Sequence, residues 1–189
     1  MEDTQVQKQI SLRNIKKMAL GDLRGIVYPR QVVLITSKAE AEVMGKRSIR
    51  DDVMAASWHT PLSFSPQMYA VVVGKERFTY KLIKKSRVFC VNFIPYSMEK
   101  TAVFAGSNSG EHMDKFKEGG IIFEECEKIE CIRLKDCLAF LECEVENEVE
   151  AGDHVIFIGR VVNSGVKKKS NERLFQLLQP GGRKFGTVK

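Results

Sequence analysis

The feature that most constrains the fold is a series of short, β-branched apolar runs separated by turn residues. Three of them read QVVLITS (31–37), MYAVVVG (68–74) and RVFCVNFI (87–94). A fourth stretch, CLAFLECEVENEVE (137–150), alternates apolar and acidic residues, as an antiparallel strand with one face in water does. VIFIGRVVNSGV (155–166) has the pattern of another long strand. Many strands with few helices predict a mainly β protein, folded as a closed or partly closed β-barrel.

Helical patterns are short and few. The segments 11–24, 78–86 and 97–106 have apolar residues near helical spacing, and a brief helical turn is expected around 114–117. The chain contains no internal repeat, no low-complexity tract and no linker long enough to separate two large domains. We therefore expect a helical N-terminal extension over 1–24 and a single domain over 25–189.

Composition and length indicate an ordinary globular protein. The chain has 189 residues, of which 43% are apolar and 29% charged. No apolar run approaches the roughly 20 residues that cross a bilayer. The polar N-terminus lacks the apolar centre of a signal peptide. These features predict a cytoplasmic protein that has no membrane partner.

The cysteines leave two interpretations open. The five cysteines are Cys90, Cys126, Cys131, Cys137 and Cys143. Their number is odd and none forms a CxxC pair, so we expect no metal site. Because four of them fall within 18 residues, a metal or iron–sulfur site is one alternative. The other is a set of reduced thiols packed as small apolar side chains in strands.

The net charge of +6 is concentrated near the C-terminus. Residues 160–189 contain eight lysines and arginines and one acid. A basic surface attracts phosphate groups, either of nucleic acid or of a phosphorylated cofactor. The chain has no helix-turn-helix, zinc-finger or RNA-binding signature, so we expect no nucleic-acid partner. A nucleic-acid-binding module remains the weakest of three functional alternatives.

Most common catalytic signatures are missing. The sequence contains no GxGxxG, GxxxxGK[ST], GxSxG or HExxH motif. The three histidines His59, His112 and His154 are far apart in sequence, and no pair of catalytic carboxylates is evident. If the protein is an enzyme, a cofactor therefore supplies the chemistry.

The stretch ASWHTPLSFSP, which begins at Ala56, is unusually rich in hydroxyl groups. Hydroxyls and backbone N–H groups at a turn between strands can surround a phosphate. A cationic partner, Arg77, follows the next strand. The alternative is that the hydroxyls cap turns around the two prolines.

The order of motifs along the chain resembles the flavin reductase-like, FMN-binding split-barrel family, and most closely its flavoredoxin and archaeal members. The matching segments are PRQVVLITS, MAASWHTPLSFSP, MYAVVVG…RFTYKLIKKSRVFCVNFI, AGSNSGEHMDKF and GDHVIFIGRVV, over about residues 25–185. The resemblance implies a six-stranded split β-barrel of Greek-key type with a few peripheral helices. It also implies a homodimer that binds FMN at or near the subunit interface.

The resemblance also implies a set of cofactor-binding residues. They are Met54, Ala55, Ala56, Ser57, Trp58, Thr60, Pro61, Leu62, Ser63, Arg77, Thr79, Tyr80 and Lys81. Residues 54–57 would run beside the isoalloxazine ring and phosphate, and 60–63 would add polar and backbone contacts. Arg77 and Thr79 would reach the phosphate. Trp58 would contact either the flavin or the core or dimer interface.

Further positions follow from the same resemblance. His112 would lie in a loop on the nicotinamide side of the flavin, with Lys115 nearby and Phe116 packed inside. The alternative is that His112 is an exposed loop histidine without a role in binding. Arg183 and Phe185 are C-terminal candidates for flavin contact. The resemblance implies no catalytic side chain, because FMN carries the chemistry.

The sequence departs from the family pattern at three places, one of which is Pro66-Gln67, where members usually have two prolines. Many members have Asn where this chain has Asp51 or Asp52, and we expect the acid to face away from the site because it would repel a phosphate. Cys131 and Cys137 have no counterpart in the pattern.

These observations predict an NAD(P)H-dependent flavin oxidoreductase. A hydride from NADH or NADPH would pass to bound FMN, and the electrons would then reach a free flavin, a ferric chelate or an iron–sulfur protein. The alternative is an electron-transfer protein that holds FMN and has no nicotinamide site of its own.

Overall fold

The computed structural model describes residues 28–43, 45–167, 173, 175–179 and 182–187. The helix expected over 11–24 and the predicted domain boundary after residue 24 lie outside these residues. In the part of the chain that is described, no helix is long and apolar enough to cross a membrane.

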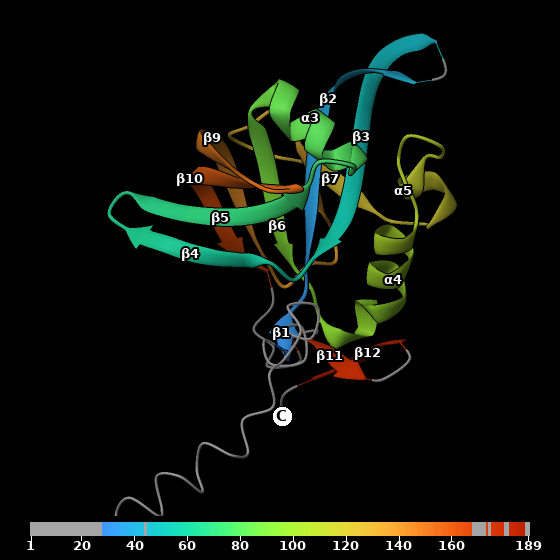
Figure 1. Ribbon diagram of the computed structural model, residues 1–189, viewed down its shortest axis with the longest axis vertical. Helices are drawn as coiled ribbons and strands as arrows, with labels where there is room; N and C mark the ends of the chain where they lie inside the picture. The colour runs from blue at the N-terminus through green and yellow to red at the C-terminus, as the bar shows by residue number, and fades with distance from the viewer. Residues whose placement is uncertain (1–27, 44, 168–172, 174, 180–181, 188–189) are drawn as a thin grey trace, which may run out of the picture.

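A seven-stranded antiparallel sheet forms the body of the protein (Figure 1). Its strands are β2 (Val33–Val43), β3 (Lys46–Ala56), β4 (His59–Phe64), β5 (Gln67–Gly74), β6 (Val88–Phe93), β9 (Ala139–Ala151) and β10 (His154–Val166). The order across the sheet is β3-β2-β6-β9-β10-β5-β4. The mainly β, split-barrel prediction is confirmed, with one strand more in this sheet than the resemblance implied.

Smaller elements surround this sheet. A three-stranded sheet contains β1 (Arg30–Gln31), β11 (Phe175–Gln179) and β12 (Gly182–Gly186). A separate hairpin pairs β7 (Phe123–Glu125) with β8 (Ile132–Leu134). The helical elements are α3 (Phe78–Ser86), the 3-10 helix η2 (Tyr96–Met98), α4 (Glu99–Ser107) and α5 (Lys115–Glu118). Figure 1 shows α4 beside β3 and α3 across the upper end of the sheet.

The three predicted short helices after residue 77 are present, and local chemistry sets their ends. α3 ends at Arg87, which adopts a left-handed conformation (φ 60°) and donates its N–H to the Ile83 carbonyl at 2.9 Å. α5 begins after Asp114, whose carboxylate accepts the N–H groups of Phe116 and Lys117, both at 3.1 Å.

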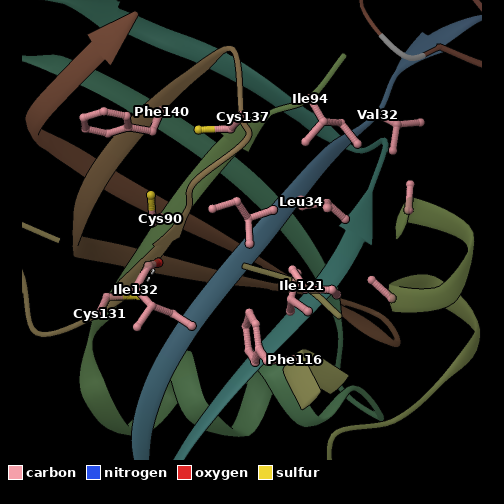
Figure 2. Close-up of a cluster of buried hydrophobic side chains, with 14 of the residues drawn as sticks. Val32, Leu34, Cys90, Ile94, Phe116, Ile121, Cys131, Ile132, Cys137 and Phe140 are labelled. Atoms are coloured by element: carbon pink, nitrogen blue, oxygen red, sulfur yellow. Dashed lines mark hydrogen bonds between the residues drawn. The ribbon is translucent and has the colours of Figure 1, made fainter. Parts of the chain in front are cut away.

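Two apolar clusters cover the two faces of the sheet. Leu34 belongs to the cluster beneath α4 and the β7–β8 hairpin, which Figure 2 shows, while Ile35 belongs to the cluster around Phe89 and Phe157. Successive residues of β2 thus enter different clusters. This burial on both faces explains why residues 32–35 form a continuous apolar run rather than an alternating one.

Two strands differ from the sequence-based expectation. β3 was not predicted, because its first half (46–50) is charged and lies on an arm that extends from the body of the sheet (Figure 1). The hydroxyl-rich stretch was expected to be a turn, but residues 59–64 form β4. Both are edge strands, where charged residues and proline are common because they discourage pairing with a further strand.

Candidate functional site

The expected cofactor segment, residues 54–63, joins the two edges of the sheet, and we call it the β3–β4 corner. β3 and β4 lie at opposite ends of the strand order, yet only Ser57 and Trp58 separate them in sequence. Each edge strand has one strand neighbour among the described residues. The outward-facing backbone N–H and C=O groups that the fold does not already bond, as it does the Val53 carbonyl, are therefore available to a ligand.

Two hydrogen bonds to carbonyl groups fix the corner. The Arg30 Nε donates to the Ser57 carbonyl at 2.7 Å. The Val72 N–H donates to the Trp58 carbonyl at 2.9 Å. The sequence analysis did not identify Arg30, since its partner is a backbone group that only the tertiary fold brings near.

His59 connects the corner to the rest of the fold. Its Nε2 lies 3.1 Å from the Gln31 carbonyl and its Nδ1 lies 2.7 Å from the Tyr69 hydroxyl. Because a carbonyl only accepts, Nε2 carries the hydrogen and Tyr69 donates to Nδ1. Burial lowers the pKa of His59 and raises the pKa of Tyr69 to about 12, so both side chains are neutral at pH 7.

The expected residues of the corner differ in exposure. Met54 and Ala56 are buried, and Ala55, Ser57 and Ser63 are half-buried. Trp58, Thr60, Pro61 and Leu62 are exposed. The Trp58 ring lies 5.1 Å from the His154 ring, centroid to centroid. Among the described residues, the hydroxyls of Ser57 and Ser63 have no hydrogen-bond partner, so both are free to bind one.

A second expected group lies at the start of α3. Arg77 is the N-cap residue of this helix, is 46% exposed at its side chain, and contacts Glu76 with Nε 3.0 Å from Oε1. The helix N-terminus and the guanidinium both favour an anion here. Lys81 is paired with Glu111 at 2.7 Å, and the Tyr80 ring packs 5.9 Å from that of Phe157.

Thr79 joins this group to β3 through a buried ion pair. Its side chain is 1% exposed, and its hydroxyl donates to Asp52 Oδ2 at 2.5 Å. The Lys115 ammonium lies 2.9 Å from Asp52 Oδ1 and donates to the Val53 carbonyl at 2.6 Å. Desolvation lowers the pKa of Lys115, against the opposing effect of Asp52. Asp52 faces Thr79, so a phosphate at Thr79 would displace an existing hydrogen bond.

The remaining candidates are dispersed. His112 is exposed, whereas Phe116 is buried in the core and Phe185 packs against the same cluster. The position of the Arg183 side chain lies outside the described structure. Lys115, expected in the loop beside the flavin, is 3% exposed and supports β3 instead.

The open pocket at α3 does not coincide with the corner. It has a volume of about 320 Å³ and lies between the β2–β3 arm and the helix, over Phe78 and Leu82. Three ion pairs, Lys81–Glu111, Lys85–Glu40 and Arg47–Glu42, line it. Of the expected site residues, only Lys81 contributes to it.

The described residues hold no group of three or more His, Cys, Asp or Glu side chains that could bind a metal ion. His59 bonds to Gln31 and Tyr69, while His154 stacks on Trp58 and contacts Asp153 at 2.7 Å. The interpretation of the cysteines as packed thiols fits Cys90, Cys131, Cys137 and Cys143, all of which are buried and free.

Comparison with known proteins identifies the family. An uncharacterized protein of Archaeoglobus fulgidus is 36% identical over 137 residues, which are 72% of each chain. Flavoredoxin from Methanosarcina acetivorans has a TM-score of 0.75 at 24% identity, covering 93% of this chain and 92% of its own. An FMN-binding protein from Thermus thermophilus has a TM-score of 0.75 at 24% identity, covering 92% and 93%. Residues 23–184 match the flavin reductase like domain, so the chain belongs to the family defined by that domain.

Proposed function

We propose that the protein binds FMN along the β3–β4 corner and accepts a hydride from NADH or NADPH. The electrons then pass to a second acceptor, which is a free flavin, a ferric chelate or an electron-transfer protein. Family membership and the fold shared with an FMN-binding protein support a flavin as the cofactor. The observation that carries the proposal is that residues 54–63 run directly from one edge strand of the sheet into the other. One ten-residue segment therefore includes part of both edges.

The chemistry of the corner matches the two ends of FMN. The polar edge of an isoalloxazine ring offers hydrogen-bond donors and acceptors, as do the unpaired backbone groups of residues 54–63 and the hydroxyls of Ser57 and Ser63. The phosphate requires positive charge and N–H groups, which Arg77 and the first turn of α3 provide. We assign the phosphate to Arg77 rather than to Thr79, whose hydroxyl is donated to Asp52.

Bound FMN would supply the hydride acceptor, its N5 atom. The work of this chain is to hold that ring in a fixed orientation and to leave one face open to a nicotinamide ring. Arg30 and Val72 fix the corner, and Trp58 at the corner is exposed. No protein acid or base is needed, which is consistent with the neutral, fully bonded His59–Tyr69 pair.

An electron-transfer protein without a nicotinamide site is the second candidate. The fold shared with flavoredoxin favours it. It uses the same corner and differs only in lacking reaction with NADH or NADPH.

A homodimer is part of the proposal. Leu62 is 49% exposed and Phe64 97% exposed on β4, next to the corner. A second copy of the chain that packs on these side chains would cover them and shield the flavin from water. The molar mass by light scattering tests this: a monomer at micromolar concentration in the presence of FMN would contradict it.

The test of function is an absorption spectrum of the full chain with FMN, recorded before and after anaerobic addition of NADH or NADPH. A bound-flavin spectrum that bleaches rapidly supports the oxidoreductase and identifies the donor. Bound flavin that stays oxidised, but is reduced by dithionite, supports the electron-transfer protein. If a desalting column separates the flavin from the protein, and titration gives a Kd above about 1 mM, the proposal fails.

A further inference from the structure

Three of the five thiols meet at one place that the proposed function does not use. Cys90 lies on β6, Cys126 directly follows β7, and Cys131 directly precedes β8. Cys90 and Cys131 belong to one core cluster, and Cys126 packs against it. Figure 2 shows Cys90 and Cys131 near Ile132 in the core cluster.

Cys126 and Cys131 continue the β7–β8 ladder by one step. Glu125 is paired with Ile132, so the next opposed pair in this register is Cys126 and Cys131. The Cys126 N–H donates to the Cys131 carbonyl at 2.9 Å, as this register requires. Directly opposed residues of an antiparallel pair have Cα atoms about 4.5–5.5 Å apart. A disulfide accepts Cα separations of roughly 4.4–6.8 Å.

The four residues between the two cysteines are held in place. The N–H groups of Glu127 and Lys128 donate to the Glu142 carboxylate, at 3.1 and 2.8 Å. The Cys131 N–H donates to the Ile129 carbonyl at 2.9 Å. These bonds hold the backbone of the two cysteines face to face without help from a covalent bond.

The two thiols differ in access. Cys126 is half-buried, whereas Cys131 is fully buried. An oxidant from solution can reach Cys126 first, and Cys131 is then the nearest thiol along the ladder. Cys90 belongs to the same cluster, but it lies within the central strand β6, opposite Thr36.

We propose that Cys126 and Cys131 are a redox-active pair that forms an intramolecular disulfide when the protein meets hydrogen peroxide. The Cys126 sulfur, as thiolate, attacks one peroxide oxygen. The O–O bond breaks, hydroxide leaves and takes up a proton to become water, and Cys126 becomes a sulfenic acid. Cys131 then attacks that sulfur, the S–S bond forms and the S–O bond breaks, and a second water leaves. Two thiols lose two electrons and two protons, and one peroxide becomes two waters.

The pH dependence of this reaction follows from the surroundings of the thiols. Cys131 acts to lower the pKa of the Cys126 thiol through a hydrogen bond. A hydrogen bond with Cys90 and burial act in the opposite direction and outweigh it, so the pKa of Cys126 is raised. Burial and Cys126 raise the pKa of Cys131. Both groups are therefore neutral thiols at pH 7, and the rate should rise by about tenfold per pH unit from pH 7 to pH 9.

Peptide mapping of the full chain tests the proposal. The native protein is treated with hydrogen peroxide, quenched with catalase, alkylated with iodoacetamide and digested with trypsin. Lys128 lies between the two cysteines, so the disulfide joins peptide 118–128 to peptide 129–133, and reduction separates them. We expect this joined species to replace the two alkylated peptides and to be lost in Cys126→Ser and Cys131→Ser. Cys137→Ser, which alters a buried thiol of the same cluster, should retain it.

Three results would overturn the proposal. The first is that Cys126 and Cys131 are both labelled by iodoacetamide when the peroxide-treated protein is unfolded and then alkylated. The second is a joined species that contains peptide 88–100, which carries Cys90. The third is sulfinic acid on Cys126 with no joined species. The assignment in the unaltered chain decides the matter even if a serine variant fails to fold, and it does not depend on flavin binding.

Discussion

Polar groups in the ion-pair network around Glu142 are bonded within the protein, whereas several polar groups at the β3–β4 corner have no partner in the part of the chain that the structure describes. Glu142 is fully buried and accepts hydrogen bonds from Glu127 N, Lys128 N and Arg133 Nη1. Arg133 is also bonded to Glu124 and Glu127, each at 2.9 Å. At the corner, by contrast, the Ser57 and Ser63 hydroxyls have no partner among the described residues, and no further described strand pairs with the outer edge of β3 or of β4.

The contrast separates stability from binding. Polar groups whose partners lie within the protein stabilise the fold, and removing one of them leaves the others buried and unpaired. Polar groups that face an open edge contribute little to folding and are available to a ligand. We therefore expect substitutions in the network to change the free energy of unfolding and substitutions at the corner to change flavin affinity.

The largest effect is expected for Glu142→Ala. The change leaves Arg133 and two loop N–H groups without their buried acceptor, so the free energy of unfolding should fall by about 3–5 kcal/mol. Urea denaturation followed by circular dichroism measures this. The folded fraction should bind FMN with unchanged affinity.

Glu150→Ala is the control for that variant, because Glu150 is exposed and paired with Lys75 on the surface. It should alter stability little. Equal losses in the two variants would contradict the distinction between network and surface.

The next effect is on binding. Arg77→Ala removes the guanidinium at the start of α3, and FMN affinity should fall by about 2 kcal/mol, or roughly 30-fold, because a charge-assisted bond to phosphate is lost. Fluorescence titration of FMN measures the change. Arg47→Ala removes another exposed arginine, on the β2–β3 arm, and should leave the Kd unchanged. An unaltered Kd in Arg77→Ala would show that Arg77 does not bind FMN.

Substitution of two serines should separate binding from stability with smaller effects. Ser57→Ala removes a hydroxyl that has no partner in the described structure, so it should cost about 1 kcal/mol of FMN affinity and almost nothing in stability. Ser37→Ala removes a buried hydroxyl that donates to the Val88 carbonyl at 3.0 Å, so the same loss should appear in stability alone. If both variants change the same quantity, the separation fails.

The smallest effect concerns pH. Burial holds the pKa of folded His59 below its ordinary value of 6.5, so above pH 6.5 the side chain is neutral whether the chain is folded or not. As the pH falls below 6.5, the unfolded chain takes up a proton that the folded protein resists, and stability decreases. Denaturation at pH 7.5 and pH 5.5 should show a larger loss for the native chain than for His59→Gln. Equal losses would mean that His59 is not responsible.

The fold was predictable where residue patterns are local. β2 and β5 are apolar runs, and α3 has the residues of a short helix, so their positions follow from sequence. β3 and β4 were missed because exposed edges carry charged residues and Pro61, which resemble loops. The positions of Asp52 and His59 were not predictable, since their partners Lys115 and Gln31 are far away in sequence and are brought near only by the fold.

Trp58 is the only tryptophan in the chain, and it lies at the corner beside His154. When the excitation wavelength selects tryptophan over the four tyrosines, the emission therefore comes from a single indole at the proposed site. Its intensity and wavelength report directly on occupancy of the corner, and energy transfer to a bound flavin would quench it. The native chain thus carries its own optical probe for ligand binding, and no label has to be attached.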